Sequence, residues 1–149
     1  MAGEKGGLRQ MFSQNPVYRR SELPTAEPWM TAAEKYATQL GIDPMAAKAL
    51  LFAESAGGYK TSNKGAKGPW QLVGKSSSPN SPEDATASAL GYFKELLNRF
   101  GGDYNNAVAA YNWGPTNVSQ NLIDNSIPVD RLPTETKRHL SRFWEYYQD

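Results

Sequence analysis

One carboxyl group in this sequence occupies an unusual position. Glu54 follows the apolar run Leu50, Leu51, Phe52 and Ala53 and precedes Ser55 near the expected end of a helix. Apolar surroundings disfavour a carboxylate, and so does the negative end of a helix dipole. A carboxyl group that keeps its proton near neutral pH can serve as a general acid. The position therefore favours an acid role for Glu54, although a solvent-exposed glutamate at a helix end would show the same spacing.

Two further clusters carry groups that suit sugar binding. The first joins Ser62 to residues 65–71, Gly-Ala-Lys-Gly-Pro-Trp-Gln, where Gln71 can both donate and accept hydrogen bonds. The second is the run Ala-Ala-Tyr-Asn-Trp-Gly-Pro at 109–115, in which two small residues allow close helix packing before a Tyr-Asn pair. Taken singly, the first cluster also fits a tight turn, and Tyr111 also fits a core position.

Composition limits the chemistry that remains. Among 149 residues there is no cysteine and one histidine, His139, which excludes a thiol nucleophile and argues against a multi-histidine metal site. With 16 Lys and Arg against 15 Asp and Glu, the net charge of +1 lacks the basic excess of a nucleic-acid binder. We expect no metal, no cofactor and no nucleic-acid partner. His139 is expected to be a surface or packing residue.

The elements that must position these clusters are mostly helical. Residues 1–25 are Gly-rich and then polar, so we expect a partly flexible N-terminal extension followed by one domain over 26–149. Apolar spacing, starting prolines and terminating glycines predict helices over 27–40, 44–56, 82–100, 104–112, 116–124 and 135–147. Between 59 and 82 only residues 70–73 suit a short strand, half of a small hairpin.

Several residues are better explained by helix formation than by chemistry. The expected N-caps are Thr25, Asp43, Asp103, Thr116 and Thr134, and Asp84 falls in a first helical turn. An apolar stripe on the last helix is expected to pack in the core; it contains Leu140, Phe143, Trp144 and Tyr147.

In combination, the clusters are much more specific than any one of them. Glu-Ser at 54–55, Gly-Ala-x-Gly-x-x-Gln at 65–71 and Ala-Ala-Tyr-Asn-x-Gly-Pro at 109–115 occur in that order, together with runs at 92–103 and 132–137. This series resembles the soluble lytic transglycosylases, relatives of goose-type lysozyme, over roughly residues 30–145. The resemblance implies a mainly α fold of the α+β lysozyme-like kind: a compact helical domain with one small irregular or hairpin lobe flanking a substrate groove.

The resemblance also implies roles for the residues that match its motifs. Glu54 corresponds to the single catalytic acid and base, and Ser55 is its motif partner. Ser62 corresponds to a serine that contacts the N-acetyl group, and Gln71 to a residue of the substrate groove. Tyr111 corresponds to a tyrosine beside the acid, expected to hydrogen-bond near Glu54.

Other positions extend or depart from the family pattern. Asn112 is the motif neighbour of the tyrosine. Trp70, in a Pro-Trp pair that replaces the usual Leu-Met, and Trp113, where a small residue is common, suit either stacking on sugar faces or core packing. The stretch 75–80 is shorter than usual. His139 stands where the family often has tyrosine.

The family cleaves the β-1,4 bond between N-acetylmuramic acid and N-acetylglucosamine in peptidoglycan strands. Because one carboxyl group lies in a motif, the resemblance implies assistance by the substrate's own 2-acetamido group and closure of a 1,6-anhydro ring. Two alternatives stay open: a hydrolytic muramidase of the endolysin kind, and a catalytically weak wall-binding module of a phage particle or secretion machine.

The sequence also bears on where the protein acts. It contains no apolar run typical of a signal peptide and none long enough to cross a membrane. We expect a monomer that is made in the cytoplasm, does not insert into membranes and acts on the cell wall. A phage virion or release at lysis is the expected route, with other virion or secretion-machine proteins as further partners.

Overall fold

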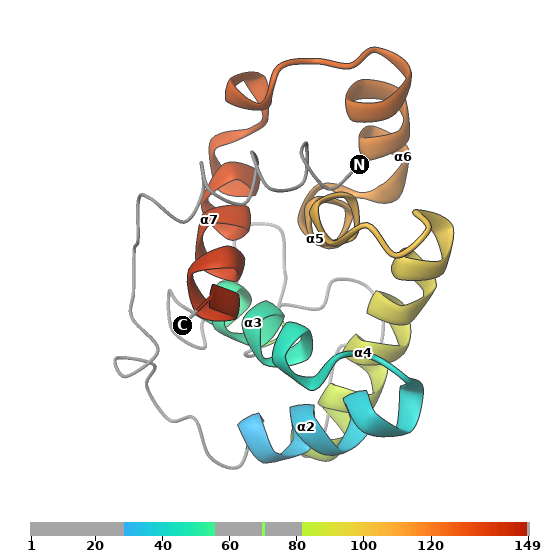
Figure 1. Ribbon diagram of the computed structural model, residues 1–149, viewed down its shortest axis with the longest axis vertical. Coiled ribbons are helices and arrows are strands. Elements are labelled where there is room, and N and C mark those ends of the chain that lie inside the picture. The colour runs from blue at the N-terminus through green and yellow to red at the C-terminus, as the bar shows by residue number, and fades with distance from the viewer. Residues whose placement is uncertain (1–28, 56–69, 71–81, 149) are drawn as a thin grey trace.

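Helices make up most of the part of the chain that the computed structural model describes, which is residues 29–55, 70 and 82–148 (Figure 1). No strand occurs in these three stretches, in agreement with the mainly α fold expected from the sequence. Trp70 lies in a turn, and the rest of the expected hairpin lobe falls outside the described residues. The helical segments are α2 (Trp29–Leu40), α3 (Pro44–Ser55), α4 (Pro82–Arg99), α5 (Tyr104–Trp113), α6 (Pro115–Asn117), η2 (Val118–Asp124), η3 (Val129–Arg131) and α7 (Thr134–Gln148).

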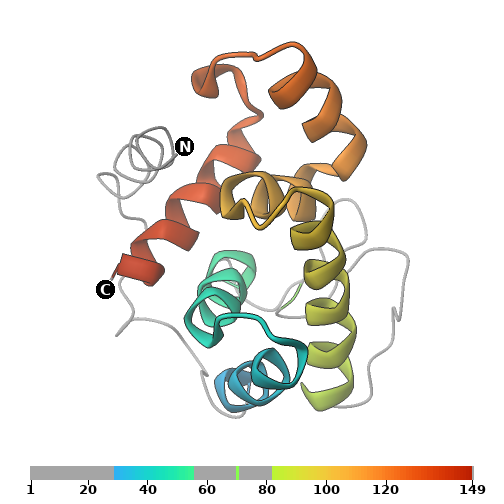
Figure 2. The same cartoon turned by 45° about the vertical axis from the view of Figure 1, so that its right-hand side comes forward.

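Helix α3 is the buried centre of this arrangement. It is apolar on almost every side, and α7 and α2 pack against it (Figures 1 and 2). Its start is fixed by Asp43, whose carboxylate accepts a hydrogen bond from the backbone N–H of Met45 at 3.0 Å. The N-cap expected at Asp43 is thereby confirmed. A helix buried on all sides carries its last-turn residues into the interior as well.

The junction between α4 and α5 follows the sequence prediction closely. Gly101 and Gly102 both have positive φ, 65° and 84°, which residues with a Cβ rarely adopt. Asp103 then caps α5, because its side chain accepts a hydrogen bond from the N–H of Asn106 at 3.0 Å. The turn between α4 and α5 is therefore specified by residues that lie within the turn itself.

The segment after α5 differs from its prediction. The helix begins at Pro115 with Gly114 as its N-cap, so Thr116 lies inside it rather than capping it. Proline is favoured at the first helical position because its fixed φ suits the helix and no N–H is needed there. The segment then widens into the π-helical turns of η2, and the N–H of Asn125 bonds to the carbonyl of Gln120 at 3.1 Å.

Helix α7 is docked by its apolar stripe, as expected. Leu140, Phe143 and Trp144 are buried, and the Trp144 indole N–H donates to Asn105 Oδ1 at 2.7 Å. Near the end of α7, the Tyr147 hydroxyl donates to Asp43 Oδ2 at 2.7 Å. These contacts hold α7 against both α5 and the start of α3.

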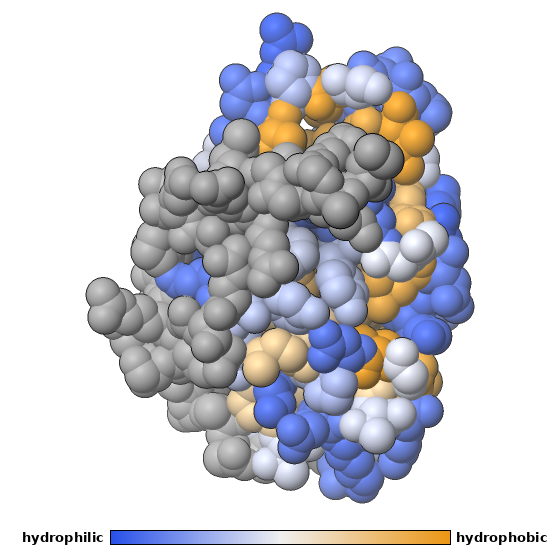
Figure 3. All heavy atoms as spheres, in the orientation of Figure 1, coloured by the Kyte–Doolittle hydropathy of each residue, from blue (hydrophilic) through white to orange (hydrophobic). Residues whose placement is uncertain are grey.

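The described surface facing the viewer in Figure 3 is mostly hydrophilic, and its apolar side chains lie mainly along the right-hand side and near the top. Among the residues described, one large apolar side chain is exposed: Ile123 of η2, with 48% of its surface accessible. None of the helices described is long and apolar enough to cross a membrane.

Candidate active site

Glu54 lies in the last turn of α3 and is buried. Only 3% of its side chain is exposed, because α7 covers this face of α3. The structure therefore does not place Glu54 as a solvent-exposed glutamate at a helix end. Its Oε2 atom has no hydrogen-bond partner among the described residues, and neither has the buried hydroxyl of Ser55. Such unsatisfied buried polar groups are rare in folded proteins and often mark a functional site.

The other carboxyl oxygen of Glu54 faces His139. Oε1 lies 3.3 Å from His139 Nε2, and 7% of the histidine side chain is exposed. Of the two expected alternatives, a surface or a packing histidine, the structure shows the packing one, and it adds a contact with Glu54. The spacing held a signal: His139 lies four residues before Phe143, so the two share the buried face of α7.

The second ring nitrogen of His139 fixes which tautomer is present. Nδ1 lies 2.8 Å from the backbone carbonyl oxygen of Glu135, which can only accept a hydrogen bond, so Nδ1 carries a proton. Burial by itself would lower the pKa of His139. The charge of Glu54, the hydrogen bond to it and the bond to the Glu135 carbonyl outweigh burial and the opposing charge of Arg142, and the pKa of His139 is raised above 6.5.

Tyr111 approaches the acid but does not bond to it in this structure. Its hydroxyl donates to the backbone carbonyl of Trp70 at 2.8 Å. Burial, followed by the nearby charge of Glu54, raises the pKa of Tyr111 well above its ordinary value. Because its one proton is used at Trp70, this hydroxyl can offer a neighbour only its lone pairs.

Trp70 packs in the core, one of the two roles that the sequence allowed; the other was stacking on a sugar. It is 1% exposed, and its indole N–H donates to Thr86 Oγ1 at 2.9 Å. Trp113 is partly buried against the same core. The burial of Trp70 favours a structural role, in which it supports the tyrosine beside the acid.

Asn112 joins the end of α5 to the start of α7. Its Oδ1 accepts a hydrogen bond from the hydroxyl of Thr136 at 2.7 Å, and Thr136 is fully buried. Thr136 and His139 are three residues apart and so share a face of α7. Tyr111 of the Tyr-Asn motif thus lies near Glu54, and Asn112 holds α7, the helix that carries His139.

Replacing Asn112 with alanine is expected to lower the free energy of unfolding by about 1 kcal/mol, because the buried Thr136 hydroxyl loses its acceptor. Urea unfolding measures this loss. The matched control is Asn121→Ala, which removes an exposed bond to the carbonyl of Asn117 and should cost less. Equal effects for the two variants would contradict the bridging role.

Ser62 and Gln71, both predicted to bind substrate, lie outside the described residues. Among the residues described, the structure therefore places Tyr111 near Glu54 and Ser55, uses Asn112 to join α5 to α7, and adds His139 to the site. Asp103 caps α5, and Asp84 is exposed in the first turn of α4, so both stand at helix starts as expected.

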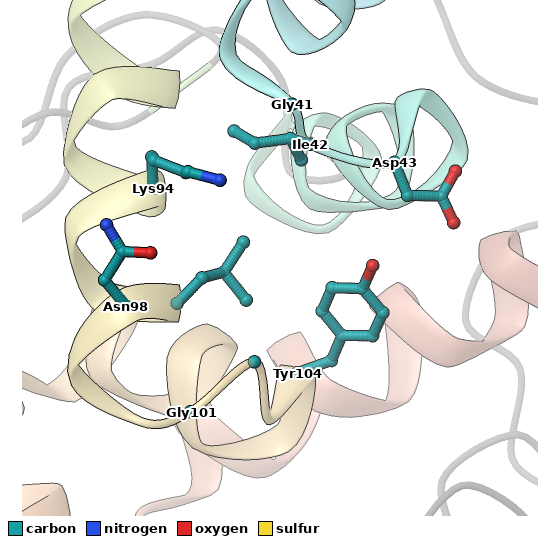
Figure 4. A pocket seen from close by; sticks show the side chains of 9 residues that line it. Gly41, Ile42, Asp43, Lys94, Asn98, Gly101 and Tyr104 are labelled. Carbon is teal, nitrogen blue, oxygen red and sulfur yellow. The ribbon is translucent and has the colours of Figure 1, made fainter.

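A separate pocket opens at the opposite end of α3. Its volume is about 340 Å³, and Figure 4 shows Lys94, Asn98, Asp43 and Tyr104 around it. It surrounds the α3 N-cap, eleven residues before Glu54, which a helical rise of 1.5 Å per residue converts to roughly 16 Å. None of the predicted site residues lines this pocket, so it is distinct from the candidate active site.

A comparison with known protein families identifies the family of this chain. The family model described as the transglycosylase SLT domain matches residues 31–127, more than half of the chain. The chain belongs to this SLT family. The matched range contains Glu54, Tyr111 and Asn112 in the order the resemblance required, and the helical fold agrees with an SLT domain. The matched range ends before α7, so His139 lies outside the residues that the family model matches.

Proposed function

We propose that this SLT domain is a peptidoglycan lytic transglycosylase that cleaves the β-1,4 bond between N-acetylmuramic acid and N-acetylglucosamine. The observation that carries the proposal is Glu54, a carboxyl group buried at the end of α3 with one oxygen unpartnered among the described residues. Leaving such an oxygen unsatisfied costs stability, which is reasonable where a substrate atom completes the site. Membership of the SLT family supports the substrate class.

In the proposed reaction Glu54 acts first as an acid and then as a base. It protonates the glycosidic oxygen while the bond from that oxygen to C1 breaks, and the bonding electrons leave with the oxygen. The 2-acetamido oxygen of the same sugar stabilises the positive charge at C1. The Glu54 carboxylate then removes the proton of the C6 hydroxyl as O6 bonds to C1. Glu54 regains its proton, and no water is consumed.

The surroundings of Glu54 support a one-carboxyl mechanism. The two other acids considered, Asp84 and Asp103, are accounted for by their positions at helix starts. We propose that Ser62 and Gln71 orient the acetamido group, as their motif positions imply. Tyr111, fixed by the Trp70 carbonyl, shapes the wall beside Glu54.

Digestion of purified peptidoglycan is expected to release muropeptides that end in 1,6-anhydro-N-acetylmuramic acid. These products are lighter by one water than those of a hydrolase, because O6 replaces water as the nucleophile. Mass spectrometry after borohydride treatment measures this, since anhydro ends resist reduction, and ¹⁸O-water should leave no label at C1.

Labelled and reducible products would replace this proposal with a hydrolytic muramidase. In that case Asp84→Asn and Asp103→Asn are the first variants to test for loss of water activation. A folded sample that releases nothing from several kinds of wall would favour a wall-binding module without catalysis.

A further inference from the structure

The buried pair formed by Glu54 and His139 has no function in the mechanism described above. The two side chains come from different helices, α3 and α7, and 3.3 Å separates Glu54 Oε1 from His139 Nε2. Both side chains are almost completely enclosed, with 3% and 7% of their surfaces exposed. A contact between two titratable groups at this depth affects the protonation of both.

The orientation of the histidine ring determines how many protons between the two side chains are energetically favourable. Nδ1 donates to the Glu135 carbonyl, so Nε2 is the atom that faces the carboxyl group. If neither Nε2 nor Oε1 carried a proton, lone pairs would face each other across 3.3 Å in a region with little water. One proton between the two atoms converts this repulsion into a hydrogen bond, whichever atom holds it.

We propose that Glu54 and His139 work as one acid–base unit that holds a single proton through the neutral pH range. His139 is then a positioning residue, and the loss of its own proton at high pH limits the acid function of the pair. This inference rests on the proposed function, because it concerns the same carboxyl group. It assigns a role to α7, which lies beyond residues 31–127, the range that the SLT family model matches.

The charged and titratable groups around the pair are compatible with this role. From α7, Arg142 opposes protonation of His139 and reaches the carbonyl of Ala53 at 3.5 Å, whereas the Glu135 carbonyl favours it. From α5, Tyr111 is neutral in this range because its pKa is well above 10. From α3, Glu54 supplies the negative charge. The balance favours the proton on His139 beyond the pH at which free histidine loses it.

The pair ends one turnover with the same number of protons as it had at the start. In the resting pair the proton moves from Nε2 to the carboxyl group, so that imidazolium and carboxylate become neutral imidazole and carboxylic acid without a change in net charge. Glu54 passes this proton to the leaving oxygen, and the pair is left with a carboxylate facing a neutral imidazole. The repulsion between the two favours recovery of a proton, and the C6 hydroxyl supplies it.

A titration by nuclear magnetic resonance tests the pair without any substrate. Because the chain has one histidine, every imidazole signal belongs to His139. Wild-type protein is expected to show a pKa above 6.5 and, at higher pH, a neutral ring with the proton on Nδ1. Glu54→Gln should lower this pKa, since the negative charge is lost and burial remains. The control Glu135→Gln keeps the carbonyl and should leave it unchanged.

A wild-type pKa at or below 6.5, or the same value in Glu54→Gln, would overturn the inference even if the enzyme cleaves peptidoglycan. This measurement also remains decisive if a His139 variant fails to fold, because it uses the native histidine.

The second test is the pH dependence of activity in His139→Gln. A glutamine can donate to Glu54 Oε1 and keep its position, but it cannot hold the shared proton. The alkaline fall in kcat/KM should move to lower pH, because the imidazole that holds the proton of the pair is gone. KM should change little. Arg138→Gln, an exposed neighbour on α7, should keep the wild-type profile.

The outcomes separate the two proposals. Anhydro products with an unshifted alkaline limb in His139→Gln would support the transglycosylase and reject the pair. Reducible products with a raised His139 pKa would reject the transglycosylase and keep the pair as the acid of a hydrolase.

Discussion

Glu54→Gln is expected to fold like the wild-type chain, and its rate on purified peptidoglycan should fall at least about 100-fold. A positioned acid–base group typically contributes a factor of about 10²–10⁴ to the rate. The replacement keeps the shape of the side chain but cannot deliver or accept the proton. Loss of turbidity of a cell-wall suspension measures the rate, and thermal unfolding checks the fold.

The matched control is Glu95→Gln, which makes the same chemical change at an exposed position on α4. It should keep a rate close to that of the wild type. A folded Glu54→Gln variant that retains more than about a tenth of the wild-type rate would remove Glu54 from the mechanism, because so small a loss lies below the range for an acid–base group.

Trp70→Ala is expected to lower the free energy of unfolding by about 3–5 kcal/mol, the usual cost of emptying a buried aromatic site. The variant removes the indole from the core and its hydrogen bond to Thr86, but it keeps the backbone carbonyl that binds the Tyr111 hydroxyl. Urea unfolding measures the loss, with Trp113→Ala as the control at a partly buried position, where the cost should be smaller.

The same pair of variants distinguishes the two roles that the tryptophans' sequence positions allow. If Trp70→Ala costs less than about 1 kcal/mol, well below the range for a buried aromatic, and weakens binding of glycan fragments instead, Trp70 stacks on a sugar and the core assignment is wrong. Trp113 remains the better candidate for stacking, because part of its surface is exposed.

Much of the fold could be predicted from the sequence because its determinants are local. The caps Asp43 and Asp103 bond to amides two and three residues away, and the glycine pair at 101–102 ends α4 with its own backbone angles. The apolar spacing of α7 likewise indicated which face packs inward. The start after α5 was mispredicted because a proline and a threonine compete for adjacent positions at a helix start.

The candidate site was predictable only in part, for a different physical reason. The motif indicated Glu54 and Tyr111, but contacts between distant segments depend on how helices pack. Nothing in the local sequence around Tyr111 shows that its hydroxyl bonds to the Trp70 carbonyl rather than near Glu54. His139 was missed in the same way: its spacing places it on the inner face of α7, but which residue of α3 it meets is decided by the packing of the two helices.

The long separation between Glu54 and His139 affects the order in which the enzyme can mature. A ribosome that has finished α5 has already made Glu54 and the Tyr-Asn pair. The helix that encloses the acid and supplies its partner is still to be translated. Contacts so distant in the chain form late in folding. A nascent chain that ends with α5 therefore lacks the histidine that contacts Glu54, and the buried pair can form only after α7 has emerged and docked.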